Sequence, residues 1–190
     1  MSHRFDKEKH HFFINDMRIP SITQCLPTQN FFVSEKRLEE TRQEGIDMHS
    51  LMKLYFDTDQ IFNEPILFAL DIMLKEHEKE FGKKLIWETP LYSDKYLFAG
   101  IEDVMFENAI IDFKRSFGNK HYHSLQLAAQ SILGKENNIC NTENWFIAFY
   151  QNSKFKLKPV YNPDAKRMFL KLVDKYYIDQ DVQEYLKGNL

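Results

Sequence analysis

Three charged side chains gather at the end of a predicted β-hairpin. Two short apolar segments, residues 104–106 and 109–111, flank a two-residue connection and predict a pair of antiparallel strands. In the register that this turn sets, Asp103 faces Asp112, and Lys114 projects from the same face as Asp112 because side chains alternate along a strand. Like charges that face each other destabilise a sheet. The two acids therefore require a bound cation, a shared proton or contact with solvent.

Of these three ways to relieve the repulsion between the two acids, a bound cation is the one that supports catalysis. A hard divalent ion such as Mg²⁺ takes oxygen ligands, and one or two carboxylates with water and a substrate phosphate complete its shell. The pattern Asp-x-Lys is also common by accident. In an ordinary hairpin with solvated ends the two acids never meet, so both interpretations are open from this pattern alone.

Length and composition indicate one folded domain over residues 1–190, with residues 1–18 and 179–190 as peripheral arms. The chain is 43% hydrophobic and 15% aromatic, which suffices for a sizeable core. It contains no apolar run of about 18 residues, and its first residues lack the apolar stretch of a secretory signal. Cys25 and Cys140 are the only cysteines and lie far apart, which argues against a zinc or iron–sulfur site and favours a reducing cytoplasm.

Charge is unevenly distributed. The net charge is −3, which does not by itself indicate nucleic-acid binding. Residues 114–158, however, include seven basic and two acidic residues, a net charge of +5. This local excess of positive charge either attracts a polyanion or consists of ordinary solvent-exposed surface lysines.

Hydrophobic periodicity places the hairpin in the middle of a series of strands and helices. We expect helices over 35–56, 63–81 and 120–133, strands over 84–91, 95–100, 144–150 and 155–161, and a last helix opening at 162–163 that frays from 179. A further strand is expected at residues 10–14. This order predicts an α/β fold with a small mixed sheet and helices on both faces.

Local residues mark the helix ends. Asn63 and Pro65 predict the start of the second helix, and Gly82 predicts its end. Asn119 predicts the start of the helix after the hairpin, and Gly134 predicts its end.

Three polar residues on these elements each have two interpretations, and a fourth has one default interpretation. His49 lies on the same helix face as Phe56. It is either a hydrogen-bonded core residue or a ligand. Gln126 and Gln130 lie one helical turn apart and either contact a phosphate or base or form a solvated surface pair. Glu88, inside a strand, is by default a solvent-facing glutamate.

Taken in chain order, these residues resemble a nuclease family over residues 19–176. The pattern consists of Pro20-Ser21-Ile22-Thr23, Gly45-x-x-x-His49, Glu88, Gly100-x-x-Asp103, Asp112-x-Lys114 and Gln126. It resembles the RecB-like branch of the PD-(D/E)XK nucleases, and within it the phage and bacterial exonucleases related to the mitochondrial genome maintenance exonuclease.

The resemblance implies a restriction-endonuclease-like core and a DNA exonuclease that uses two Mg²⁺ or Mn²⁺ ions and prefers single strands or ends. Asp103, Asp112, the Phe113 carbonyl and His49 would be metal ligands. Lys114 would orient the attacking water and stabilise charge on the phosphate. Asp103, Asp112 and Lys114 would thus form the catalytic set.

The resemblance also implies a DNA surface and a setting. Ser116, Gln126 and Gln130 would contact DNA, although the family usually has tyrosine where this chain has Gln130. Glu88 matches a recurrent glutamate with a less defined role. The iron–sulfur cysteines of some relatives are absent from this chain. The expected partners are DNA and phage or host replication and recombination proteins, not a membrane, in the cytoplasm of a bacterial or phage-infected cell.

Three alternatives stay open from the sequence. They are an endonuclease of the same superfamily, a non-catalytic module on the same fold that binds DNA or a replication protein, and an interaction protein whose acids are structural. Neither the polarity of digestion nor the oligomeric state is indicated by the sequence.

Overall fold

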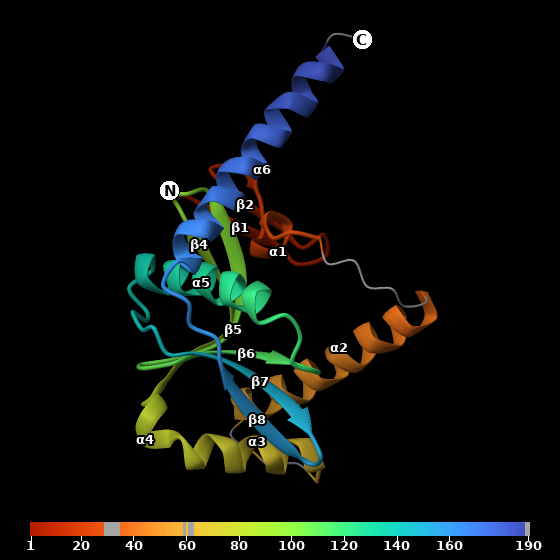
Figure 1. The fold of residues 1–190 in the computed structure, drawn as a ribbon, viewed down its shortest axis with the longest axis vertical. Helices are drawn as coiled ribbons and strands as arrows, with labels where there is room; N and C mark the ends of the chain where they lie inside the picture. Colours follow the sequence, from red (N-terminus) through yellow and green to blue (C-terminus); the bar gives the residue numbers. More distant parts are fainter. Residues whose placement is uncertain (29–34, 59, 61–62, 189–190) are drawn as a thin grey trace.

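A five-stranded mixed sheet forms the centre of the protein, in the order β4-β5-β6-β7-β8 (Figure 1). The computed structural model describes residues 1–28, 35–58, 60 and 63–188. The strands are β4 (Lys84–Ser93), β5 (Phe98–Phe106), β6 (Ile110–Lys114), β7 (Trp145–Gln151) and β8 (Lys154–Pro159). All neighbours pair antiparallel except β6 and β7, which are parallel. The predicted α/β class with a mixed sheet is confirmed.

Helices cover both faces of this sheet, as predicted. One core lies between the sheet and the helices α1 (Ile22–Cys25), α5 (Lys120–Glu136) and α6 (Ala165–Gly188). The other lies against α2 (Glu35–Thr58), α3 (Pro65–Glu76) and α4 (Glu78–Phe81). Figure 1 shows α5 on one side of the sheet, α3 on the other, and the C-terminal part of α6 extending beyond the rest of the molecule.

The hairpin of β5 and β6 has the predicted register. Val104 pairs with Ile111, Met105 pairs with Ile110, and the Phe106 amide donates to the Ala109 carbonyl at 2.8 Å. Met105 and Ile110 enter the core under α5, whereas Val104 and Ile111 enter the core under α2 and α3. Burial on both faces explains the three large apolar residues among the five of β6, and it makes the buried acid at its centre exceptional.

Several predicted boundaries were wrong. The helix expected over 63–81 is two helices that meet at His77, and the first is capped by Glu64 rather than Asn63. Gly82 does end α4, with a φ of 72° that favours glycine. Gly134 lies inside α5, where a Cβ would come within 2.9 Å of Met105 Sδ, so it allows close helix–sheet packing and does not stop the helix.

Two more expectations differ in extent. The strand expected over 95–100 and the first strand of the hairpin are one long strand, β5. The last helix does not fray at 179, since α6 continues to Gly188.

Residues 3–19 form a second, three-stranded sheet from β1 (His3–Asp6), β2 (His11–Ile14) and β3 (Met17–Ile19). Of this sheet, the sequence predicted only the strand at 10–14. Phe12 and Ile19 pack against Tyr92 and Ala99 of the larger sheet. These residues are therefore packed onto the body of the protein.

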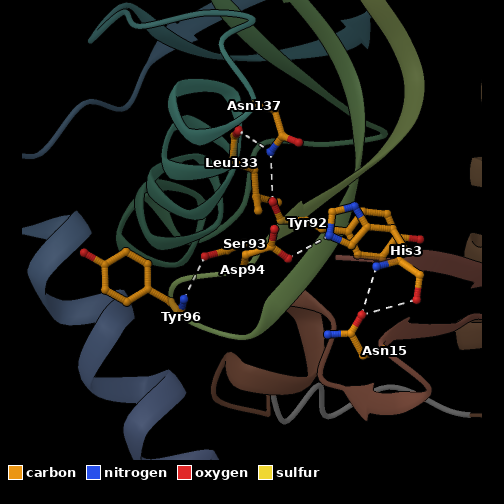
Figure 2. Close-up of polar contacts among 9 residues, drawn as sticks. His3, Asn15, Tyr92, Ser93, Asp94, Tyr96, Leu133 and Asn137 are labelled. Carbon is orange, nitrogen blue, oxygen red and sulfur yellow. Dashed lines mark hydrogen bonds and ion pairs between the residues drawn. The ribbon is translucent and has the colours of Figure 1, made fainter.

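The turn between β4 and β5 is held from both sides (Figure 2). The His3 ring stacks on Tyr92 with 4.5 Å between ring centroids, and its Nε2 lies 2.7 Å from Asp94 Oδ1. From the end of α5, Asn137 Nδ2 donates to the Tyr92 carbonyl at 2.9 Å. These contacts fix the strand pair that bears the acidic site. Among the described helices, none has the length and apolar composition needed to cross a membrane.

Candidate metal and phosphate site

Asp112 is a buried carboxylate with two fixed partners. Its side chain, on the central strand β6, is only 2% exposed. Oδ1 accepts a hydrogen bond from Gln126 Nε2 of α5 at 2.8 Å, and Oδ2 lies 2.7 Å from Lys114 Nζ. A buried charge needs such partners because desolvation is costly. Burial acts to lower the pKa of Lys114, but Asp112 and then Asp103 outweigh it and keep that pKa above its ordinary value.

Asp103 lies at the point where β5 and β6 separate. Its Oδ2 accepts from the Phe113 amide at 2.7 Å, so the side chain takes a hydrogen bond that a strand partner would otherwise receive. Burial, followed by the charge of Asp112, raises the pKa of Asp103 from 3.8 to about 6. His49, Lys114 and the Phe113 amide oppose this shift without cancelling it. The two acids predicted to face each other therefore interact unfavourably.

His49 and Glu88 complete this side of the site. His49 Nδ1, from α2, lies 3.9 Å from both Asp103 Oδ1 and Glu88 Oε1. The pairs Trp87–Val104 and Thr89–Glu102 place Glu88 across from Asp103. With a φ of 40°, Glu88 has left the strand conformation, and its side chain lines the cavity. The default interpretation of Glu88 as a solvent-facing strand residue is confirmed in part, since Glu88 lies in β4 and its side chain is partly exposed, but that side chain also lies beside His49.

Glu102 is an acid of this site that the sequence analysis missed. It is 1% exposed, and neither carboxylate oxygen has a hydrogen-bond partner in the described structure. Burial, then Asp103 and Asp112, raises its pKa well above the ordinary value. The only signal in the sequence was its position next to Asp103.

An irregularity in β5 explains how two consecutive acids approach one site. Phe98 and Val104 are an even number of residues apart, yet Phe98 packs under α5 and Val104 packs under α2. Side chains of a regular strand with this spacing share a face. The strand therefore changes faces between them, beside the left-handed Glu88 of its partner. This change brings both Glu102 and Asp103 near Asp112.

A cavity of about 250 Å³ opens beside Asp103, whereas Glu102, Asp112 and Lys114 are not among the residues that line it. His49, Glu88 and Asp103 line one part of it, and Gln126 and Gln130 of α5 line another. Residues of the β1–β2 turn, β2 and α1 also contribute to its wall. The Pro20–Thr23 segment of the sequence pattern is thereby brought to the same place as the acids.

The residues predicted to contact DNA are placed differently from one another. Ser116 is exposed in the loop after β6. Gln126 and Gln130 are both buried, so the interpretation as a surface pair was wrong. Gln126 orients Asp112, whereas Gln130 Oε1 has no partner in the described structure. The helical period placed these residues on one side of α5 but did not show that this side faces the sheet.

The donor set fits a hard divalent cation. The carboxylates of Glu102, Asp103 and Asp112 repel one another, Lys114 interacts favourably with Asp112 and Asp103, and neither oxygen of Glu102 has a hydrogen-bond partner among the described residues. Oxygen donors of this kind suit Mg²⁺ or Mn²⁺. Among the described residues, no three His, Cys, Asp or Glu side chains are already grouped as a metal centre. Metal binding would therefore require side-chain movements, in particular at Asp112, whose oxygens contact Gln126 and Lys114.

Comparison with known proteins adds no assignment, since no protein-family model matches the chain and no match was found among the curated proteins.

Proposed function

We propose that this protein is a Mg²⁺- or Mn²⁺-dependent DNA exonuclease of the RecB-like PD-(D/E)XK branch, with a restriction-endonuclease-like core. The observation that carries the proposal is the approach of Asp103, Asp112 and Lys114 to one another, with His49 and Glu88 beside Asp103 at the cavity that Asp103 lines. Four separate elements, α2, β4, β5 and β6, supply these groups. An accidental Asp-x-Lys pattern does not account for that convergence.

The residues divide the chemistry of phosphodiester hydrolysis among them. Asp103 and Asp112 would hold the cation, with His49 and the Phe113 carbonyl as further ligands. When bound, the cation supplies a water of lowered pKa and neutralises charge on the phosphate. Lys114, held by Asp112, would place a fixed positive charge beside the reacting phosphate, where preorganised charges contribute most.

One observation favours a second candidate, a DNA-binding module without catalysis. Oδ1 of Asp112 already accepts a hydrogen bond from Gln126, and Oδ2 forms an ion pair with Lys114, so the charge of this carboxylate is balanced without a metal. In that case the acids would have a structural role. The protein would gain no stability from Mg²⁺ or Mn²⁺ and would cleave nothing.

A cleavage assay separates these candidates. End-labelled linear single-stranded DNA and a closed circle of the same sequence are incubated with Mg²⁺ or Mn²⁺. We expect the wild type to digest the linear strand and leave the circle intact. Asp112→Asn abolishes digestion, and Asp174→Asn, an equal charge change on an exposed part of α6, preserves it. Cleavage of the circle indicates an endonuclease, and no cleavage by the wild type refutes both enzymes.

The proposal extends to the setting of the reaction. We infer action in the cytoplasm of a bacterial or phage-infected cell, alongside phage or host replication and recombination proteins. Both cysteines are free thiols and are buried, which suits a reducing compartment. Co-purification of tagged protein from such cells, with and without nuclease treatment, tests for the protein partners.

A further inference from the structure

The outer strand β8 presents a row of lysines. Lys154, Lys156 and Lys158 alternate with Phe155 and Leu157 along the strand. The two apolar residues pack into the core formed with α2 and α3, and the three lysines are exposed. Because side chains alternate, the lysines project from the opposite face of the sheet, the face that bears α5.

The strand register aligns this row with the acidic site. Lys156 pairs with Phe149 of β7, which pairs with Lys114 of β6. Lys158 pairs with Ile147 of β7, which pairs with Asp112 of β6. Paired residues in neighbouring strands project from the same face. The backbone of the row therefore lies two strand spacings, about 10 Å, from the backbone at Asp112 and Lys114, with β7 between them.

The row is also uniformly basic. Neither β7 nor β8 contains an acidic residue. Successive lysines are two residues apart, which spaces their Cα atoms by roughly 7 Å. Lysine is a flexible point charge that suits phosphate groups without reading a base. In a protein with a net charge of −3, this is a local surface of the opposite sign.

We propose that Lys154, Lys156 and Lys158 bind the phosphate backbone of single-stranded DNA and guide the strand to Asp112 and Lys114. The inference rests on the proposed function, because it names the path by which that substrate reaches the site. The row fixes backbone position and carries no sequence preference.

A structural role for the same lysines makes a different prediction. Lysines on an outer strand also prevent edge-to-edge association of sheets. Lys156 Nζ donates to Gln151 Oε1 at 2.7 Å, which is a purely local contact. If edge protection is their only role, their loss causes self-association and leaves DNA binding unchanged.

The test measures binding without cleavage. Fluorescence anisotropy of a labelled oligothymidine is recorded in EDTA over a series of salt concentrations. It compares the wild type with a variant in which Lys154, Lys156 and Lys158 are all glutamine. A matched control carries three exposed lysines elsewhere changed to glutamine: Lys79, Lys171 and Lys175. A third variant, with arginine at the three β8 positions, keeps the charge.

We expect the β8 glutamine variant to bind roughly tenfold or more weakly at low salt. Its slope of log affinity against log salt should fall by about 2, since each phosphate contact to a single strand contributes about 0.7. The control and the arginine variant should behave like the wild type. Light scattering checks the oligomeric state, and if the triple variant associates, each single variant should lower the slope by about 0.7.

Three results overturn the inference: no DNA binding by the wild type, an equal loss in the β8 and control variants, or self-association without a change in slope in the single variants. Failure of the exonuclease proposal can be distinguished from failure of this inference. A wild type that binds through β8 but cleaves nothing refutes the enzyme and retains the lysine row.

Discussion

Asp103→Asn should stabilise the fold when no metal is bound. The substitution removes a negative charge that burial and Asp112 disfavour, and it keeps an oxygen that accepts the Phe113 amide hydrogen bond. Its side chain is only 14% exposed, so solvent screens the repulsion weakly. An acid that stabilised the fold would give the opposite result.

The magnitude follows from the pKa of Asp103. A rise from 3.8 to about 6 corresponds to about 3 kcal/mol, at 1.36 kcal/mol per pKa unit. Because the folded state holds this proton more tightly than the unfolded state, the wild type loses stability as the pH rises from about 4 to beyond 6. The advantage of the variant is therefore absent near pH 3 and complete near pH 8. For a chain of this size it corresponds to a rise in Tm of about 6–12 °C.

The assay is urea and thermal unfolding in EDTA across this pH range, with Asp174→Asn as the control for charge. Addition of Mn²⁺ should reverse the order of the two proteins. A cation that binds only the folded wild type adds about 4.1 kcal/mol at a thousandfold excess over its Kd, which exceeds the advantage of about 3 kcal/mol that the variant has without metal, and the variant has lost a ligand. A variant that is no more stable than the wild type at pH 8, or a difference that does not depend on pH, would refute the electrostatic reasoning.

Three further substitutions test the surroundings of the acids. Lys114→Met should lower the cleavage rate by about 10²–10³-fold. It should also reduce the free energy of unfolding by about 3–5 kcal/mol because Asp112 loses its ion-pair partner. Single-turnover kinetics and urea unfolding measure the two effects, and near-normal cleavage would show that Lys114 has no role in the reaction. Gln126→Ala should cost about 1–3 kcal/mol in urea unfolding, since a buried Asp112 oxygen loses its donor, and an unchanged midpoint would show that the contact is dispensable. Gly100→Ala should lower the free energy of unfolding by about 1–3 kcal/mol because the added Cβ would lie 2.5 Å from Ile22 of α1. In Gly45→Ala the added Cβ meets nothing within 4 Å, so this substitution should stabilise α2 by about 0.5–1 kcal/mol. Calorimetry that ranks the two alanine variants the other way would contradict the packing.

Local signals in the sequence predicted the parts of this structure that depend on neighbouring residues. The hairpin register was predicted correctly because a two-residue turn fixes which residues pair. The same register brought Asp112 and Lys114 to one face. No local signal indicates where α5 lies on the sheet, so neither the burial of Gln126 nor the close packing of Gly134 against Met105 is predictable from the sequence.

Other features depended on contacts between distant segments. Glu102 becomes part of the site because β5 changes faces near Glu88, a feature that no periodicity in the sequence encodes. The segment before residue 20 contributes a sheet and part of the cavity wall only because it packs on Tyr92. The basic balance of residues 114–158 was visible in the sequence, but its alignment with Lys114 required the pairing of β6, β7 and β8.

The most direct test of the central claim is a crystal of the protein soaked in Mn²⁺ and measured at the manganese absorption edge. We expect an anomalous peak bonded to carboxylate oxygens of both Asp103 and Asp112, with His49 beside it, and no such peak in Asp112→Asn. Absence of the peak from the wild type, or a peak bonded to neither acid, would contradict the account.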